Sequence, residues 1–406
     1  MTGEKLAKEV HPRPYFHSTL NIVLYTMADY TLVATATFGV ESIVAEELKR
    51  LGHTDLTVEN GHVTFPGSAT DIVRCNIALR CADRLLIQMA SFEATDFEEL
   101  FQQTRAVAWE DLIPADGKMH VTGKSVRSKL QSVPDCQAIV KKAVVEAMKR
   151  KYHESWFPET GPVYKIEVAL LHDHITLTVD TSGPGLHKRG YRTGSGEAPL
   201  KETLAAAMVL LSRWEPGREL ADPFCGSGTI PIEAALIGRR MGPGINRSFV
   251  AESWPTMSPN LWQEARREAR SLSVAADFRV LASDADGTVL KAARENAEAA
   301  GVADAIPFQK QPVDQFRSAR KYGCIVCNPP YGERTGYIRD VERLYRAMGE
   351  AYSRLDCWSL FALSPHPRFE QLFGRRAERK RKLFNGNIQC HLYQYLGPLP
   401  PPRHQS

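Results

Sequence analysis

The sequence predicts an α/β protein with a doubly wound parallel sheet in its C-terminal half and a smaller α+β region in front of it. Beyond residue 200, strand-like apolar runs alternate with helical segments, and the first of these strands meets its helix through a glycine-rich turn. Before residue 181, strand-like and amphipathic runs alternate without such a turn. A chain of 406 residues has room for two or three domains.

The composition is that of an ordinary globular protein. Hydrophobic residues make up 43% and charged residues 24% of the chain, which excludes the disordered and collagen-like classes. No run approaches the roughly 18 apolar residues that a membrane helix needs, and the N-terminus is polar. We therefore expect a cytoplasmic protein with no membrane contact. The net charge of +4 permits an anionic partner without requiring one.

Eight cysteines are spread along the chain, and a chain of this length needs no disulfide framework. Only Cys324 and Cys327 have the two-residue spacing of a zinc-ligand pair. They flank Ile325 and Val326 in a strand-like run and lack a second ligand pair. We expect buried free thiols and no metal.

The N-terminal half predicts an extension followed by a small α+β unit. Residues 1–28 mix charge, proline and histidine without a period, as a loosely held extension does. The expected elements are a strand over 30–36, a helix from Gly39 to Leu51, a hairpin of 56–58 with 62–65, a helix over 135–151, and strands over 163–170 and 175–179.

The C-terminal half begins after a run of glycine, serine, proline and cationic residues over 181–196, which predicts a linker. The elements expected beyond it are a helix over 200–211, a strand over 219–221, a helix over 229–237, a strand over 278–283, a helix over 288–300, and a strand over 324–327. A helix over 338–355, a strand over 357–363 and an antiparallel hairpin around Asn385 and Gly386 complete the predicted sheet.

The first two motifs with chemical potential lie at consecutive strand ends. Gly226 and Gly228, in the turn Asp222 to Thr229, allow backbone N–H groups to approach an anion or polar group. The turn lacks the third glycine of the dinucleotide motif and the lysine of a phosphate loop, and a plain strand-to-helix turn is the alternative. Asp284, at the end of the next strand, is placed to accept ribose hydroxyls. Asp286 can contact the ligand as well, or it can cap the helix that follows.

The third motif is Asn328, Pro329, Pro330 and Tyr331, directly after a predicted strand. The prolines have no N–H, so their carbonyls and the Asn328 oxygen form an acceptor site beside an aromatic ring. A planar amine, as on guanine, adenine or glutamine, can donate both hydrogens there and direct its lone pair toward an electrophile. A structural turn is the alternative, and the position beside the other two motifs favours a site.

The three motifs in this order resemble class I methyltransferases that use S-adenosylmethionine (SAM), in the form that methylates amino nitrogens. Over residues 30–397 the chain resembles the THUMP-domain RNA guanine-N2 methyltransferases, especially the bacterial 23S rRNA enzymes. The segments that extend the resemblance are Leu186 to Arg192, Ala198 to Thr203, Pro243 to Arg247 and Gly332 to Arg334.

This resemblance implies an extension over 1–28, a ferredoxin-like piece over 29–75, a THUMP RNA-binding domain over 76–182, a linker over 183–198 and a Rossmann-like methyltransferase domain over 199–400. It implies SAM as cofactor, and as its contacts Asp222, Phe224, Gly226, Gly228 and Asp284, with Thr203 and its neighbours as further candidates. It makes Asn328 to Tyr331 the catalytic site for the target base. Where many relatives read the adenine with an acidic residue, this chain has Pro312; Asp314, Gln311 or a backbone group can take that role.

The resulting hypothesis is methyl transfer from SAM to the N2 amine of a guanine in structured RNA, with 23S rRNA favoured over tRNA. The alternatives are guanine-N2 methylation of tRNA, adenine-N6 methylation of DNA, glutamine methylation in a protein, and a non-catalytic RNA-binding assembly factor. Methylation at guanine N7 fits less well, because a ring nitrogen offers Asn328 no hydrogen.

Three groups of cations are candidates for RNA contact. The densest contains six cations in eight residues, from Arg375 to Lys382. The others are Lys118, Lys124, Arg127 and Lys129 in the presumed THUMP region, and Lys188, Arg189 and Arg192 at the linker. A solvated charged face is the alternative for each.

Overall fold

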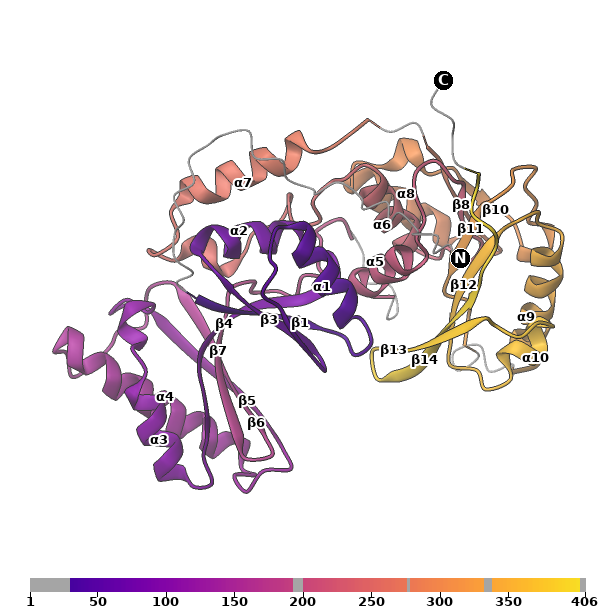
Figure 1. Cartoon of the computed structure of the whole chain (residues 1–406). Helices are drawn as coiled ribbons and strands as arrows, with labels where there is room; N and C mark the ends of the chain where they lie inside the picture. The colour runs from indigo at the N-terminus through magenta and orange to yellow at the C-terminus, as the bar shows by residue number, and fades with distance from the viewer. Residues whose placement is uncertain (1–29, 193–199, 276–277, 332–337, 402–406) are drawn as a thin grey trace, which may run out of the picture.

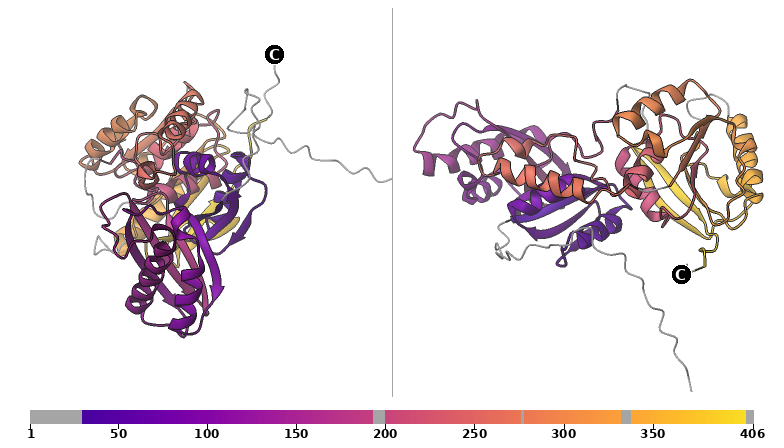
Figure 2. Two further views of the ribbon diagram at one scale, coloured as in Figure 1. Left: turned by 90° about the vertical axis from the view of Figure 1, so that its left-hand side faces the viewer. Right: turned by 90° about the horizontal axis from the view of Figure 1, so that it is seen from above.

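The computed structural model describes residues 30–192, 200–275, 278–331 and 338–401. The predicted extension, together with Ala198, Pro199 and Gly332 to Arg334 of the resemblance, lies outside these ranges. Two lobes lie side by side, an N-terminal lobe with strands β1–β7 and a C-terminal lobe with strands β8–β14 (Figures 1 and 2). Within the described ranges, no helix is both long and apolar enough to cross a membrane.

One seven-stranded sheet forms the N-terminal lobe, in the order β2-β3-β1-β4-β7-β6-β5. The long strand β4 pairs with β1 through its first half and with β7 through its second, so it joins β1–β3 and β5–β7 into one sheet. The elements of this lobe are β1 (Tyr30–Ala36), α1 (Glu41–Arg50), β2 (Thr57–Glu59), β3 (His62–Gly67), α2 (Ala69–Ala78), β4 (Ala82–Glu93), α3 (Phe97–Ala106), β5 (Lys118–Val126), α4 (Val133–Tyr152), β6 (Val163–Leu171) and β7 (His174–Asp180).

The C-terminal lobe is the doubly wound sheet that the sequence predicts, in the order β10-β9-β8-β11-β12-β14-β13. Helices α5, α6 and α8 cover one face, and α9 and α10 cover the other (Figure 1). The elements are α5 (Glu202–Leu211), β8 (Leu220–Asp222), α6 (Thr229–Gly238), β9 (Val280–Asp284), α8 (Val289–Ala299), β10 (Phe308–Lys310), β11 (Cys324–Cys327), α9 (Ile338–Ser353), β12 (Ser359–Ser364), α10 (Phe369–Phe373), β13 (Arg379–Asn385) and β14 (Ile388–Tyr395).

The predicted antiparallel closure and the predicted buried thiols are both confirmed. Strand β14 pairs antiparallel with β12 and with β13, after the parallel strands β8 to β12. Cys324 and Cys327 are fully buried in β11 and form no disulfide.

A segment between α6 and β9 crosses from the C-terminal lobe onto the N-terminal lobe, which the sequence analysis did not predict. It carries α7 (Pro259–Ser271), which lies over α2 (Figure 1). The Gly244 N–H donates to the Ile77 carbonyl at 2.9 Å, and a Cβ on Gly244 would lie 2.7 Å from the Asn76 carbonyl oxygen. Only glycine permits this approach. The segment Pro243 to Arg247, which extends the family resemblance, therefore serves the contact between the lobes.

The same segment places aromatic rings against the N-terminal sheet. The indole of Trp254 stacks on Tyr164 of β6 at 4.7 Å between ring centroids, and it donates to the Val163 carbonyl at 3.0 Å. Both rings are buried, and such pairs add about 0.5–1.5 kcal/mol beyond their burial. We name residues 239–272 the crossover segment.

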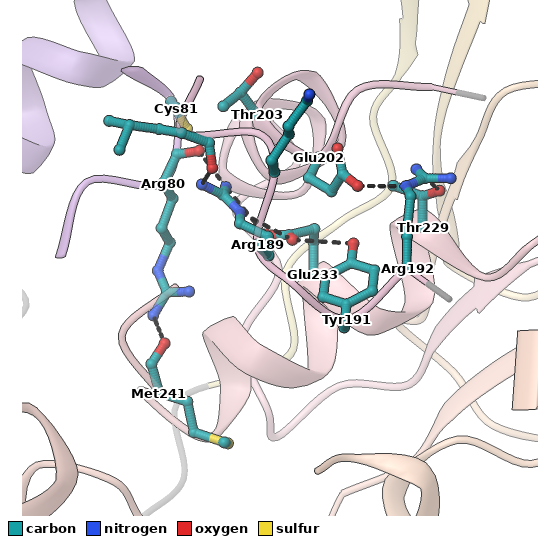
Figure 3. Close-up of polar contacts among 12 residues, drawn as sticks. Arg80, Cys81, Arg189, Tyr191, Arg192, Glu202, Thr203, Thr229, Glu233 and Met241 are labelled. Atoms are coloured by element: carbon teal, nitrogen blue, oxygen red, sulfur yellow. Dashed lines mark hydrogen bonds and ion pairs between the residues drawn. The ribbon is translucent and has the colours of Figure 1, made fainter. Parts of the chain in front are cut away.

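A buried ionic network lies where the two lobes meet (Figure 3). The Arg189 guanidinium contacts the Glu233 carboxylate of α6 at 3.3 Å, and the Tyr191 hydroxyl donates to the same carboxylate at 3.2 Å. Arg189 also donates to the backbone carbonyls of Leu186 and Arg80. Arg189 and Glu233 are only 4% and 0% exposed.

This network corrects the expectation that Arg189 binds phosphate at the linker. Its guanidinium is buried and donates to protein oxygens, because a charge in this junction needs a partner to offset its desolvation. Arg192 likewise contacts Glu202, and it donates to the Thr229 hydroxyl at 2.8 Å. Arg189 and Arg192 of the predicted linker therefore pack into the junction, whereas Lys188 is exposed and its contact with RNA stays a prediction.

Candidate active site

A pocket of about 490 Å³ opens at the carboxyl ends of β8, β9 and β11. That edge of a doubly wound sheet is the usual place for ligands. The pocket brings together most of the site residues that the sequence predicts: Phe224, Gly226, Asp284, Asp314, Asn328, Pro329, Pro330 and Tyr331.

The glycine-rich turn forms one wall. Gly226 has φ of +49°, a left-handed conformation that favours glycine, and the space that a Cβ would occupy there is open. Its N–H donates to Oδ2 of Asp284 at 3.0 Å, so the turn and the end of β9 hold each other in place. The other oxygen, Oδ1, accepts the N–H of Asp286 at 2.9 Å.

Asp286 itself is exposed and serves the turn before α8. Its Oδ1 accepts the backbone N–H and the hydroxyl of Thr288, and these bonds hold the pKa of Asp286 below its usual range. Asp286 therefore has the capping role before the helix that the sequence predicts as one of its two alternatives.

Two further residues of the first motif lie behind the pocket rather than in its wall. Asp222 is 1% exposed and accepts the Phe224 N–H at 3.0 Å, and burial raises its pKa well above the usual range. Gly228 has φ of +86°, and a Cβ there would lie 3.3 Å from Cβ of Ala293 in α8. Both shape the turn, and their direct contact with a cofactor stays a prediction.

The Asn-Pro-Pro-Tyr motif is held by a directional chain of hydrogen bonds. The Tyr331 hydroxyl donates to Oδ1 of Asn328 at 2.6 Å, and the Asn385 amide donates to the same hydroxyl at 3.2 Å. The Cys390 thiol also donates to this hydroxyl at 3.6 Å. Burial, then the nearby Cys390, raises the pKa of Tyr331 far above its usual range, so the phenol keeps its proton.

This chain fixes the orientation of the Asn328 amide. Because Oδ1 of Asn328 can only accept and the Asn385 amide donates to the Tyr331 oxygen, the phenolic proton is directed at Asn328. Oδ1 of Asn328 has a second lone pair, which remains an acceptor for a substrate amine. The sequence predicts a stacking role for the Tyr331 ring and contains no signal for this hydrogen bond.

The remaining wall contains residues that the sequence analysis did not assign to the site. Leu344 and Ala347 of α9, together with Asn385 and Ile388 of the terminal hairpin, line the pocket. For Asn385 the sequence predicts only a place in an Asn-Gly turn. Asp314 is exposed in a 3-10 turn after Pro312, and both residues line the pocket. A contact between Asp314 and the cofactor adenine stays a prediction.

Comparison with protein families gives three matches along the chain. Residues 31–86 match the RlmL ferredoxin-like domain, residues 94–180 match the THUMP domain, and residues 189–394 match the RMKL-like methyltransferase domain. The domain limits predicted from the sequence stay predictions.

Individual relatives agree with these families. The chain is 49% identical over 383 residues to "Putative RNA methyltransferase YpsC" of Bacillus subtilis, covering 94% of this chain and 99% of that one. It is 33% identical to "Ribosomal RNA large subunit methyltransferase K/L" of Syntrophotalea carbinolica, covering 89% of this chain and 53% of that one. The chain thus spans about half the length of the K/L relative.

Solved structures show the same architecture. A predicted N6-adenine-specific DNA methylase from Listeria monocytogenes is 49% identical with a TM-score of 0.87, covering 91% of this chain and 96% of that one. A putative methyltransferase complexed with SAH, the product that SAM leaves, is 43% identical with a TM-score of 0.87, covering 92% of this chain and 99% of that one.

Proposed function

Because this chain belongs to the RMKL-like methyltransferase family, with a ferredoxin-like and a THUMP domain ahead of the catalytic domain, we propose that it methylates the N2 amine of a guanine in structured RNA. SAM is the cofactor of this methyltransferase family, and a structural relative holds SAH. The single observation that carries the assignment of an exocyclic amine as methyl acceptor is the oriented Asn328 oxygen at the pocket. The choice of RNA follows the THUMP domain, and the choice of guanine follows the family resemblance of the sequence. We favour 23S rRNA over tRNA because the curated K/L relatives are named for the large ribosomal subunit.

The pocket fits an adenosine-bearing cofactor. Its volume lies within the usual range for such ligands, and it combines apolar walls with the carboxylates of Asp284 and Asp314. The open space at Gly226 lets a ligand approach the backbone, and the Asp284 oxygens retain lone pairs for ribose hydroxyls. The sulfonium of bound SAM supplies an already activated methyl group.

The chain's own residues supply alignment. Oδ1 of Asn328 and the Pro329 carbonyl accept the two hydrogens of the exocyclic amine, which turns its lone pair toward the methyl group. The aromatic ring of Tyr331 stacks on the base. Once the nitrogen becomes tetrahedral, its proton leaves to Asn328 or to water, so a strong general base is unnecessary. A guanine within a duplex cannot reach this pocket, so the target is unpaired or flipped out.

We expect Asp284→Ala to weaken SAM binding by about tenfold to a hundredfold, because the ribose hydroxyls lose their acceptor and the Gly226 turn loses its anchor. Isothermal titration calorimetry with SAM measures the change. The matched control is Asp286→Ala, which removes a neighbouring exposed carboxylate that accepts hydrogen bonds from Thr288. Equal SAM affinity in the wild type and Asp284→Ala contradicts the assigned role.

The reaction itself is tested with methyl-labelled SAM and total RNA from a strain that lacks this gene. Labelled rRNA and tRNA fractions are digested separately, and the modified nucleoside is identified by mass spectrometry. Label in N2-methylguanosine of the rRNA fraction is the expected result. Label in another nucleoside overturns the base assignment, and label in tRNA alone overturns the choice of rRNA.

Adenine-N6 methylation of DNA is the second candidate, because the Listeria relative bears that name and the Asn328 site accepts an adenine amine equally well. Genomic DNA added to a parallel reaction tests it. N6-methyladenine there, without label in RNA, would replace our proposal.

A further inference from the structure

Strand β13, at the edge of the C-terminal sheet, connects the catalytic pocket with a second cleft. Its last residue, Asn385, lines the catalytic pocket, and its first, Arg379, lines a cleft of about 780 Å³. That cleft lies between α1 of the N-terminal lobe and the end of α5 and the terminal hairpin of the C-terminal lobe. Six residue steps at roughly 3.3 Å separate the two ends, a path of about 20 Å.

The second cleft is strongly cationic. Its carboxylates are those of Glu46, which pairs with Lys49, and Glu47, which accepts the N–H groups of Arg80 and Cys81. Its cations are Arg50, Arg213, Arg218, Arg379, Lys380 and Arg381.

These cations divide into structural and exposed groups. Arg218 donates to the carbonyls of Tyr322 and Gly323, and Arg381 donates to the Gly39 carbonyl across the lobe boundary. Arg213 and Arg379 are exposed at the cleft. The positive lining favours a polyanion along the edge of β13.

Along β13, between Arg379 and Asn385, Phe384 forms a pair of aromatic rings with Phe38 of the N-terminal lobe, and we call this pair the aromatic step. Phe38 is 43% exposed and meets Phe384 edge to face at 5.9 Å between centroids. The exposed Lys382 ammonium lies 5.7 Å from the first ring centroid and 5.3 Å from the second. Exposed aromatic rings beside cations are what proteins use to bind single-stranded nucleic acid, since bases stack on the rings and phosphates contact the cations.

We propose that Phe38, Arg213, Arg379, Lys382 and Phe384 form a binding strip for the single-stranded RNA next to the target base. The inference rests on RNA being the substrate. Both lobes contribute to the strip, so the RNA strand passes over their boundary as it leaves the catalytic pocket. The aromatic step receives the nucleotide nearest the target, and the cleft receives the phosphates beyond it.

The test measures binding of a fluorescein-labelled 12-nucleotide oligouridine by anisotropy at several salt concentrations. Oligouridine contains no guanine, so it reports on the strip without the methyl-acceptor base. Arg213→Ala with Arg379→Ala is expected to reduce the slope of log Kd against log salt by about 1.4, or about 0.7 for each cation. Phe38→Ala is expected to raise Kd by about tenfold with the slope unchanged, because stacking carries no counterion release.

Arg267→Ala is the matched control, since this exposed cation lies on α7, away from β13, and is expected to change neither value. Calorimetry with SAM confirms that each variant is folded. If Kd and slope are unchanged in both strip variants while the wild type methylates RNA, the strip is wrong and the proposed function stands. A lower melting temperature in Phe38→Ala with unchanged Kd also overturns the strip and makes the aromatic step a clasp between the lobes. Absence of RNA methylation by the wild type rejects the proposed function, and with it the RNA strip.

Discussion

Asn328→Ala is expected to reduce methyl transfer by about a hundredfold to a thousandfold while SAM affinity changes by less than about twofold. The side chain removed is the acceptor that orients the substrate amine, and it makes no bond to the Gly226 turn or to Asp284 within the described part of the site. Single-turnover transfer to RNA and calorimetry with SAM separate the two effects. Near-normal turnover would remove Asn328 from the catalytic machinery.

Tyr331→Phe is the companion variant, because it keeps the ring and removes only the hydroxyl that orients Asn328. We expect an intermediate loss of turnover, since the stacking surface survives and the Asn328 amide is free to rotate. Adding Asn385→Ala to Tyr331→Phe should cost little more, because Asn385 acts on Asn328 through the Tyr331 hydroxyl. A full additive loss would show that Asn385 contacts the substrate independently.

Glu233→Gln is expected to lower the free energy of unfolding by about 3–5 kcal/mol. The variant leaves the Arg189 guanidinium buried without its counter-charge and perturbs the bond from Tyr191. Urea unfolding followed by tryptophan fluorescence measures the shift. Trp254, in the crossover segment at the lobe boundary, makes the signal sensitive to this region.

Asp304→Ala is the control for this second prediction. It also removes a carboxylate paired with an arginine, Arg239, but the Asp304 side chain is 74% exposed. We expect it to cost no more than about 1 kcal/mol, since exposed pairs are screened by water. Equal losses in the two variants would show that burial does not set the value of the Arg189 pair.

Local signals allowed much of the fold to be predicted. The strands Tyr30–Ala36 and Cys324–Cys327 have the predicted limits because each is a short apolar run with a clear boundary. Strand β10 was missed because its three residues are half-buried or exposed and carry no apolar run. The crossover segment was missed because its partners, such as Ile77 and Tyr164, lie more than 80 residues away along the chain.

Some contacts of the candidate site could likewise be predicted from the sequence, and others could not. Gly226, Asp284 and Asn328 lie at the carboxyl ends of three parallel strands of one sheet, so their meeting at one edge could be predicted from the alternation of strands and helices. Asn385 comes from an antiparallel hairpin beyond that pattern, and its contact with Tyr331 spans 54 residues. The sequence predicts Arg189 as a candidate RNA contact at the linker, with a solvated face as the alternative, because no local signal pairs it with Glu233.

The crossover segment limits how this protein can be divided into parts. Trp254 and Gly244 belong to the catalytic half but pack against the N-terminal lobe. Cutting the chain at residue 199 would therefore remove this interface from both pieces. Chimeras that exchange RNA-binding modules between relatives should therefore transplant residues 239–272 together with the N-terminal lobe. Evolution faces the same constraint, because substitutions around Ile77 and Tyr164 must be matched in a gene region more than 80 codons downstream.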